Sequence, residues 1–133
     1  MAKVLDDDIG LFTQGICWLL KYFKNINQSY KVYLKPSVSE FKQIVKDKKA
    51  DRLYIFGHGK RNCLKFESGL YIKYKELKGH PKKQFIGQYH CNHGGGKSLA
   101  DYIEVEEKDI SNFYRFNLLN YFKFFLKYIK SKI

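Results

Sequence analysis

The sequence predicts an α/β fold, a three-layer α/β/α sandwich with a mainly parallel central sheet of about four to six strands. Apolar runs rich in β-branched and aromatic residues, typical of buried strands, occur at 30–35, 53–56 and 85–89. Stretches with the apolar spacing of helices flank these runs. The 133 residues suffice for one domain, and no Ser/Gly-rich linker divides them, so we expect a single domain over 1–133.

The first half of the chain is expected to fold as helix, strand and helix. Apolar residues at near-helical spacing predict a helix over 9–25, and a strand follows at 30–35. Ser37 and Glu40 have the spacing of a capping box, in which each side chain bonds the other's backbone N–H. The second helix should therefore cover 37–48.

The middle of the chain is expected to complete a βαβ unit and then form a hairpin. The strand at 53–56 follows the second helix after a short turn, which implies a parallel pair with the strand before that helix. Runs at 64–66 and 70–74, separated by a glycine-containing turn, predict an antiparallel hairpin. A short helix is expected over 74–77.

The remaining elements are a core strand and two helices. The strand at 85–89 should be followed by a helix over 97–103 and by a short strand or connector at 104–107. Residues 112–133 are expected to form a helix with a wide apolar face, which more often packs on a sheet or another subunit than on a membrane. We therefore expect core packing, with a homo-oligomer through this helix as the first alternative and contact with an anionic membrane as the least favoured one.

The charge of the chain favours anionic partners. Lys and Arg together number 25 against 13 Asp and Glu, a net charge of +12. Nucleic acid is one such partner, and the pairs Lys48–Lys49 and Lys82–Lys83, with the C-terminal lysines, could follow a phosphate backbone. This inference rests on net charge alone, because the sequence has no recognition-helix or RNA-binding signature. A solvated, lysine-rich surface gives the same composition.

The cysteines and the N-terminal segment predict a cytoplasmic protein. Cys17, Cys63 and Cys91 are an odd number without a disulfide framework, which fits a reducing compartment. The acidic run at 6–8 precedes the first apolar stretch, the reverse of a secretory signal. No apolar run is long enough to span a membrane.

Two buried strands end in reactive side chains flanked by glycine. His58 stands between Gly57 and Gly59 after one strand, and Cys91 follows the strand at 85–89. Ligands normally bind at the carboxyl edge of an open parallel sheet. If the two strands are neighbours, they deliver a thiol and a base to that edge, which predicts a cysteine hydrolase.

The surroundings of Cys91 fit a nucleophile. Because a helix is expected after the glycines at 94–96, its dipole would stabilise a thiolate at Cys91. The backbone N–H groups of Gly59 and Cys91 are candidate donors to an oxyanion. Cys17, on a helical apolar stripe, and Cys63, in a hairpin arm, fit buried core positions instead.

The order strand, helix, strand ending in His-Gly, hairpin, short helix and strand ending in Cys resembles the caspase-like (clan CD) cysteine peptidases. The resemblance covers about Tyr30 to Ile103. It implies that His58 is the general base, Gly59 gives an oxyanion amide and Cys91 attacks. The family usually has a small residue where this chain has His90, so a minimal or inactive relative that keeps the fold stays an alternative.

Metal binding is a second hypothesis for the same region. His90, Cys91 and His93 cluster in the sequence, with His80 and Cys63 as further N/S ligands for zinc. Adjacent residues of a strand point to opposite faces, and the usual zinc spacings are absent. We therefore expect no metal site.

A third hypothesis concerns the run from 94 to 98. Gly94-Gly-Gly-Lys97-Ser98 stands between a strand and a helix, as a phosphate-binding loop does, but lacks the first glycine of that pattern. Lys97 and Ser98 therefore stay weak candidates for binding an anion.

The sequence thus favours a cysteine endopeptidase that hydrolyses a protein or peptide substrate through an acyl-enzyme. The expected peptidase needs no metal or organic cofactor. The alternative is a non-catalytic basic module that binds nucleic acid or another anionic partner.

Overall fold

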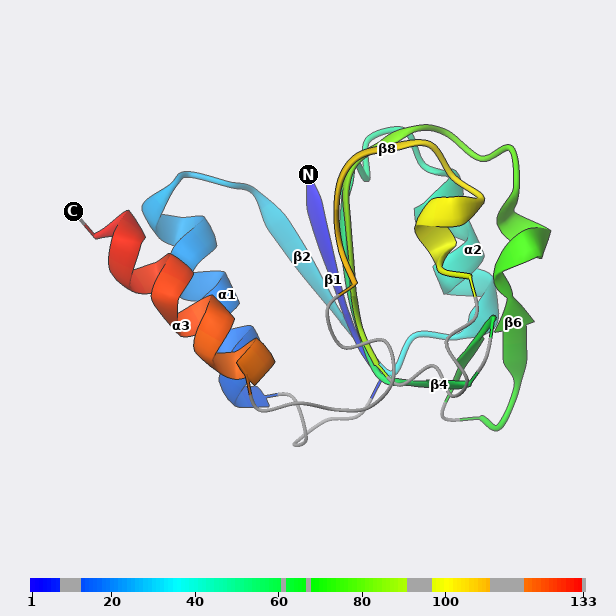
Figure 1. Cartoon of the computed structure of the whole chain (residues 1–133), viewed down its shortest axis with the longest axis horizontal. Helices are drawn as coiled ribbons and strands as arrows, with labels where there is room; N and C mark the ends of the chain where they lie inside the picture. The colour runs from blue at the N-terminus through cyan, green and yellow to red at the C-terminus, as the bar shows by residue number, and fades with distance from the viewer. Residues whose placement is uncertain (8–12, 61, 67, 91–96, 111–118, 133) are drawn as a thin grey trace.

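The computed structural model describes residues 1–7, 13–60, 62–66, 68–90, 97–110 and 119–132. Five strands form one sheet in which every neighbouring pair is parallel (Figure 1). In spatial order these are β2 (Tyr30–Leu34), β1 (Ala2–Asp6), β3 (Arg52–Phe56), β7 (Lys83–Tyr89) and β8 (Val105–Asp109).

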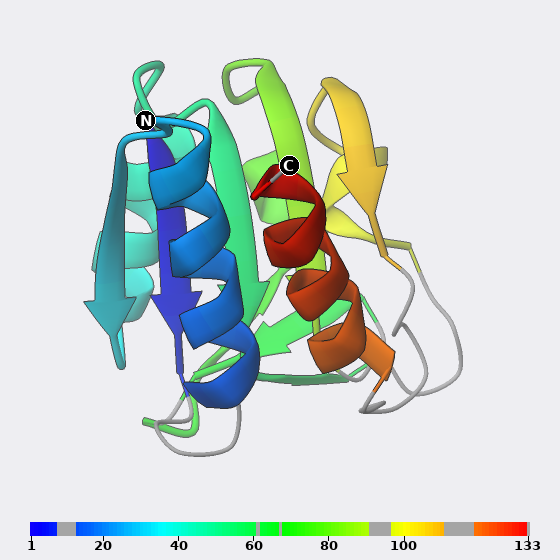
Figure 2. The same cartoon turned by 90° about the vertical axis from the view of Figure 1, so that its left-hand side faces the viewer.

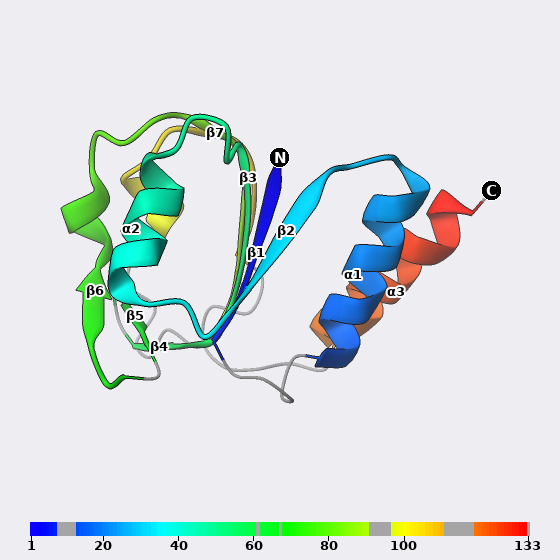
Figure 3. The same cartoon turned by 180° about the vertical axis from the view of Figure 1, so that it is seen from behind.

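Helices cover both faces of this sheet. On one face lie α1 (Thr13–Asn25) and α3 (Leu119–Ser131), side by side (Figure 2). On the other lie α2 (Val38–Lys46), the 3-10 turns η1 (Tyr74–Leu77) and η2 (Leu99–Asp101), and a small antiparallel sheet of β4 (His58–Lys60), β5 (Cys63–Lys65) and β6 (Tyr71–Lys73) (Figure 3). The predicted α/β class with a parallel sheet between two layers is confirmed.

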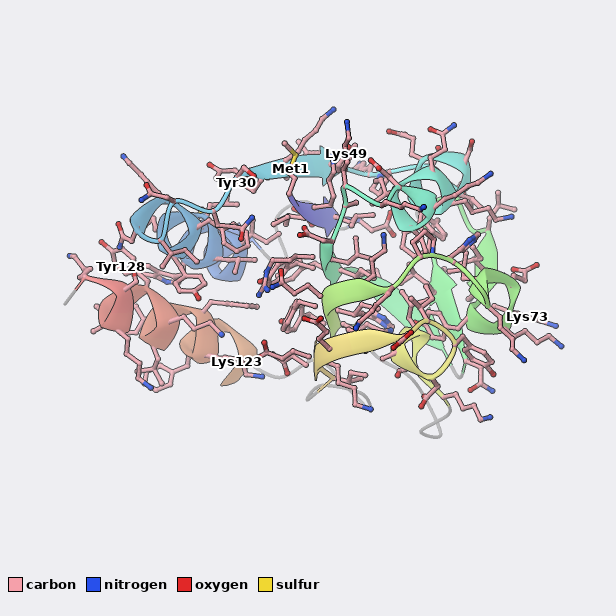
Figure 4. All side chains as sticks on the ribbon, turned by 90° about the horizontal axis from the view of Figure 1, so that it is seen from above. Met1, Tyr30, Lys49, Lys73, Lys123 and Tyr128 are labelled. Carbon is pink, nitrogen blue, oxygen red and sulfur yellow. The ribbon has the colours of Figure 1, made fainter. Side chains whose placement is uncertain are left out.

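The strand β1, which the sequence did not reveal, occupies the middle of the sheet. It lies between β2 and β3, so the strands at 30–34 and 52–56 are parallel but not neighbours. The expectation of a directly paired βαβ unit was wrong. The first residue helps to fix β1, because the Met1 amino group bonds the Lys49 carbonyl O at 3.0 Å and pairs with the Asp51 carboxylate at 2.9 Å (Figure 4).

Two apolar cores lie on the two faces of the sheet. Val4 of β1 and Phe56 of β3 belong to the core under α1 and α3, whereas Leu5 and Ile55 belong to the core under α2. The strands β1 and β3 therefore bury side chains on both faces, which is typical of a parallel sheet. This explains why β3 and β7 appear in the sequence as nearly continuous apolar runs.

Local signals located most elements correctly. The capping box of α2 is present, since Glu40 N–H donates to Ser37 Oγ at 3.1 Å and Ser37 N–H donates to the Glu40 carboxylate at 3.2 Å. The hairpin pairs Cys63 with Lys73, and η1 follows at once. The expected strand at 85–89 begins two residues earlier, at Lys83.

The elements after β7 match the expectation only in part. The helix expected over 97–103 is only the three-residue turn η2. The acidic segment expected at 104–107 as a short strand or connector is the edge strand β8. After Gly57 the chain forms the short strand β4 at His58–Lys60, which local pattern did not reveal. Of the helix predicted over 9–25, the part from Thr13 is present, and 9–12 lie outside the described residues, as do 112–118 of the last helix.

Candidate active site

The carboxyl ends of β1, β3 and β7 meet at one edge of the sheet. The chain runs from β1 outward to β2, then crosses back to β3 and continues to β7 and β8. The direction of winding therefore reverses between β1 and β3. Such a switch point, at the carboxyl ends of the strands, is where open α/β sheets bind ligands.

Neighbouring strands β3 and β7 lead to the two residues of the predicted dyad. In the β3–β7 ladder Phe56 is paired with Tyr89. His58 comes two residues after Phe56, and Cys91 comes two residues after Tyr89 in the sequence. His58 is exposed at the start of β4. Cys91 itself, with the glycines at 94–96, lies outside the described residues.

Gly57 allows the ends of β1 and β3 to approach each other closely. A Cβ added at Gly57 would stand 3.0 Å from the Cβ of Asp7, and its φ is not positive. Its glycine is therefore required by the contact with Asp7 rather than by a left-handed turn. The Asp7 N–H donates to the Phe56 carbonyl O at 3.0 Å. This bond joins the ends of β1 and β3 two residues before His58.

Two buried carboxyl groups at this edge escaped the sequence analysis. Asp6 is 4% exposed and Asp7 is 9% exposed. Both follow the apolar residues of β1, and a short apolar run before an acidic residue was the only available signal. They place acidic side chains at the switch point, next to the turn that leads to His58.

A buried polar cluster holds the end of β7. Gln88 Nε2 lies 3.0 Å from both the Tyr74 hydroxyl and His90 Nε2, and those two groups are also 3.0 Å apart. Gln88 Oε1 accepts the Leu99 N–H at 2.9 Å. Because an amide nitrogen only donates, His90 Nε2 accepts and the ring proton belongs on Nδ1.

His90 is therefore a structural residue at this edge. It is 1% exposed and its neighbour Tyr74 is fully buried. Burial raises the pKa of the Tyr74 hydroxyl far above its usual range, so Tyr74 stays protonated and can keep its place in the cluster. Of the two histidines near the strand ends, the exposed His58 is the better candidate for a base.

The remaining predicted residues are placed as follows. Gly59 lies within β4 opposite Leu64 and is partly exposed. The Lys97 backbone N–H donates to Asn62 Oδ1 at 2.6 Å, which connects η2 to the β4–β5 turn. The Lys97 ammonium lies 5.7 Å from the centre of the Tyr102 ring. That ring lines a pocket of about 240 Å³ with Asn62, Cys63, Lys73 and Lys75.

Ser98 is engaged by a carboxylate. Its N–H and hydroxyl both donate to Asp101 Oδ2, at 2.6 and 3.2 Å, and its side chain is buried. The negative charge of Asp101 stands where an anion bound by Ser98 would lie. Of the two candidate anion-binding residues, Lys97 and Ser98, only Lys97 is therefore exposed.

The cysteine predictions are corrected in one case. Cys63 is buried, as expected, but Cys17 is exposed on α1. The apolar stripe of α1 that faces the sheet passes through Ile16 and Leu19 instead. No group of three metal-ligating side chains occurs among the residues that the structure describes; Cys91 and His93 of the zinc hypothesis lie outside them.

The predicted basic patch at 82–83 is also corrected. Lys83 is fully buried and its ammonium donates to the Asp47 carbonyl O at 2.8 Å. Burial lowers the pKa of Lys83, and the nearby Asp47 and Asp51 carboxylates oppose that shift. Lys82 is exposed but lies 3.4 Å from the Glu106 carboxylate. Lys82 and Lys83 therefore do not form an open basic surface that could bind phosphates.

Comparisons with protein-family models, with curated proteins and with solved structures found no match for this chain. Its function is therefore inferred from the residues gathered at the carboxyl edge of the sheet.

Proposed function

We propose that the protein is a caspase-like cysteine peptidase in which Cys91 is the nucleophile and His58 the general base. The observation that carries the proposal is the parallel β3–β7 pair with Phe56 opposite Tyr89. Both reactive residues follow that rung by two positions in the sequence. Parallel neighbours that end at one edge are what a thiol and its base require.

The proposed reaction follows the chemistry of a thiol–imidazole pair. An imidazole nitrogen of His58 takes the proton of Cys91 Sγ, and the thiolate attacks the carbonyl carbon of a peptide bond. The N–H groups of Gly59 and Cys91 donate to the oxyanion. His58 then protonates the leaving amine, and water, deprotonated by His58, hydrolyses the thioester and regenerates the thiol.

The described surroundings support this division of roles. His58 is exposed and can reach a substrate, whereas His90 is held in the buried cluster with Gln88 and Tyr74. That cluster fixes His90, the residue directly before Cys91 in the sequence. A rigid element next to a nucleophile keeps the reacting atoms in place, which is a condition for efficient catalysis.

The competing proposal is a non-catalytic basic module, and one of the basic patches predicted for it, Lys82–Lys83, is not an open basic surface. Lys83 is buried and Lys82 lies beside Glu104 and Glu106. An inactive relative that keeps the fold would lack a Cys91 thiol activated by His58. The decisive measurement is therefore made on that thiol.

The test is the rate at which iodoacetamide alkylates each cysteine between about pH 5 and 9, followed by peptide mass spectrometry. Cys17 is an exposed reference and Cys63 a buried one. Cys91 should react about tenfold or more faster than Cys17 near pH 6, because pairing with His58 maintains a thiolate there. His58→Ala should remove this excess and leave Cys17 unchanged.

His80→Ala is the matched control, because His80 lies beside α2 in a pocket lined by Lys42 and Lys46. It should leave the Cys91 profile intact. If Cys91 follows the pH profile of Cys17 and does not respond to His58→Ala, the dyad is refuted. If the dyad is present, Cys91→Ser should abolish hydrolysis of a peptide library without lowering the unfolding midpoint.

A further inference from the structure

The outer side of the layer formed by α1 and α3 carries an exposed apolar stripe. Phe122, Leu126 and Ile129 of α3 are 56%, 40% and 39% exposed. Their spacing of four and three residues puts them on one side of the helix. The side that packs inward is different, since Phe124 is fully buried against Phe56 and Tyr89.

The charge of this layer has a single sign. Helices α1 and α3 contain five lysines and no acidic residue. Lys21 and Lys24 of α1 and Lys130 of α3 are exposed. Lys123 is turned toward the sheet, where it pairs with the Asp109 carboxylate of β8 at 2.8 Å (Figure 4).

Partly exposed aromatic side chains complete the surface. The ring of Trp18 in α1 packs against two rings of α3. Its centre lies 4.8 Å from that of Phe125 and 5.2 Å from that of Tyr128. The Lys21 ammonium lies 4.7 Å from the centre of the Trp18 ring. Trp and Tyr that are neither buried nor fully solvated are characteristic of the boundary between lipid and water.

We propose that the outer surface of α1 and α3 binds an anionic lipid bilayer, with α3 lying in the plane of the headgroups. Lysines attract the negative surface of such a bilayer, and Phe122, Leu126 and Ile129 enter the boundary with the acyl chains. Among the residues that the structure describes, no helix is long and apolar enough to cross a membrane.

Charge complementarity selects this occupant over the others. A second copy of the chain docked symmetrically through this face would bring lysines against lysines with no acidic residue on either helix. A nucleic acid would satisfy the lysines but would leave Leu126 and Ile129 in water. An anionic bilayer satisfies both the charge and the apolar stripe.

Binding in this orientation leaves the exposed His58 away from the bilayer. The strand β4, which begins with His58, lies at the end of the sheet and not over the face covered by α1 and α3 (Figure 1). The bilayer would thus hold the protein by one helical layer.

The test uses the full chain, whose single tryptophan, Trp18, is a built-in reporter on the proposed surface. Phosphatidylcholine vesicles with about 30 mol % phosphatidylserine should pellet the protein and shift Trp18 emission to the blue. Vesicles of phosphatidylcholine alone should bind at least about tenfold more weakly. Binding should also weaken as the salt concentration rises above about 0.1 M.

Two pairs of matched variants test the surface itself. Phe122→Gln with Leu126→Gln should weaken vesicle binding about tenfold or more, as should Lys21→Gln with Lys130→Gln. Leu34→Gln with Leu70→Gln removes two leucines of 60% and 59% exposure elsewhere, and Lys42→Gln with Lys46→Gln removes two exposed lysines of α2. Both of these control pairs should stay within about twofold of the parent protein.

Several outcomes would overturn the proposal. These are equal binding to neutral and anionic vesicles, equal losses in the test and control pairs, or no pelleting by anionic vesicles. Dimerisation that Phe122→Gln with Leu126→Gln abolishes, without vesicle binding, would assign the face to a second copy. Displacement from vesicles by a single-stranded oligonucleotide that binds more tightly would assign it to nucleic acid. Circular dichroism and the unfolding midpoint show whether each variant is folded.

Discussion

At the scale of single residues, one amide organises the end of β7. Gln88 donates toward Tyr74 and His90 and accepts from the Leu99 N–H, all in a buried environment. A buried polar group without a partner costs free energy, whereas a fully bonded cluster fixes one conformation. Three polar side chains can therefore be buried together in the core. One of them, His90, directly precedes the proposed nucleophile Cys91 in the sequence.

Gln88→Leu should lower the free energy of unfolding by about 2–4 kcal/mol, because it leaves the Leu99 N–H without its acceptor and removes the donor to Tyr74 and His90. Urea unfolding measures the change. Gln84→Leu, at an exposed position of the same strand, is the control and should change stability by less than about 0.5 kcal/mol. Equal losses in both variants would contradict a special role for Gln88.

Gly87 is required by the ring of its neighbour on the same side of β7. A Cβ added there would stand 2.8 Å from two ring carbons of Tyr89. Gly87→Ala should therefore destabilise the fold by about 1–3 kcal/mol. In a Tyr89→Leu background the same change should cost much less, and a double-mutant cycle in urea measures this coupling. Additive losses would mean that the two positions do not clash.

At the scale of elements, helices and strands were defined by different kinds of information. The helix α2 depends on residues three apart, Ser37 and Glu40, which bond each other's backbone. The strand β1 has no comparable local signal, since its side chains enter both cores. A five-residue strand buried on both faces does not alternate in polarity, so it resembles any other short apolar segment.

Ser37→Ala should destabilise the protein by about 1 kcal/mol, because the Glu40 N–H loses its acceptor at the start of α2. The change is measured from the thermal or urea midpoint. Ser39→Ala, two residues along the same helix at an exposed position, is the matched control. It should be neutral or slightly stabilising because alanine favours helix. A loss at Ser39 as large as that at Ser37 would contradict the capping role.

At the scale of the whole molecule, the two cores contain buried ionisable groups that make stability depend on pH. Burial raises the pKa of Tyr54, Tyr74 and Tyr89, and the Asp109 carboxylate raises that of Tyr89 further. Above pH 10.0 the unfolded chain loses these protons while the folded protein keeps them. Folding stability is therefore complete below pH 10 and falls as the pH rises.

The free energy of unfolding should fall by up to about 1.4 kcal/mol per tyrosine for each pH unit above 10. Lys83 acts with the opposite sign, because its lowered pKa means that the unfolded chain holds the extra proton below 10.5. Urea unfolding between about pH 8 and 11 measures the net slope. Tyr89→Phe should flatten the slope, whereas Tyr71→Phe, at an exposed position, should not. An unchanged slope in Tyr89→Phe would refute this cause.

The candidate site was predictable only in part. The two strands that precede His58 and Cys91 were found because glycines and apolar runs mark strand ends locally. Asp7 and the partners of His90 were not found, because their positions follow from the meeting of β1, β7 and η1. The same holds for Lys83, whose pattern in the sequence is that of a surface lysine.

The sequence by itself determined the α/β class, the capped helix α2, the hairpin and the strands that precede His58 and Cys91, since each depends on residues a few positions apart. Only the tertiary structure decided the place of β1 between β2 and β3, the burial of Lys83 and His90, and the exposure of Phe122, Leu126 and Ile129. These outcomes depend on which distant segments share a core. That choice is made by the packing of whole faces and not by any local pattern.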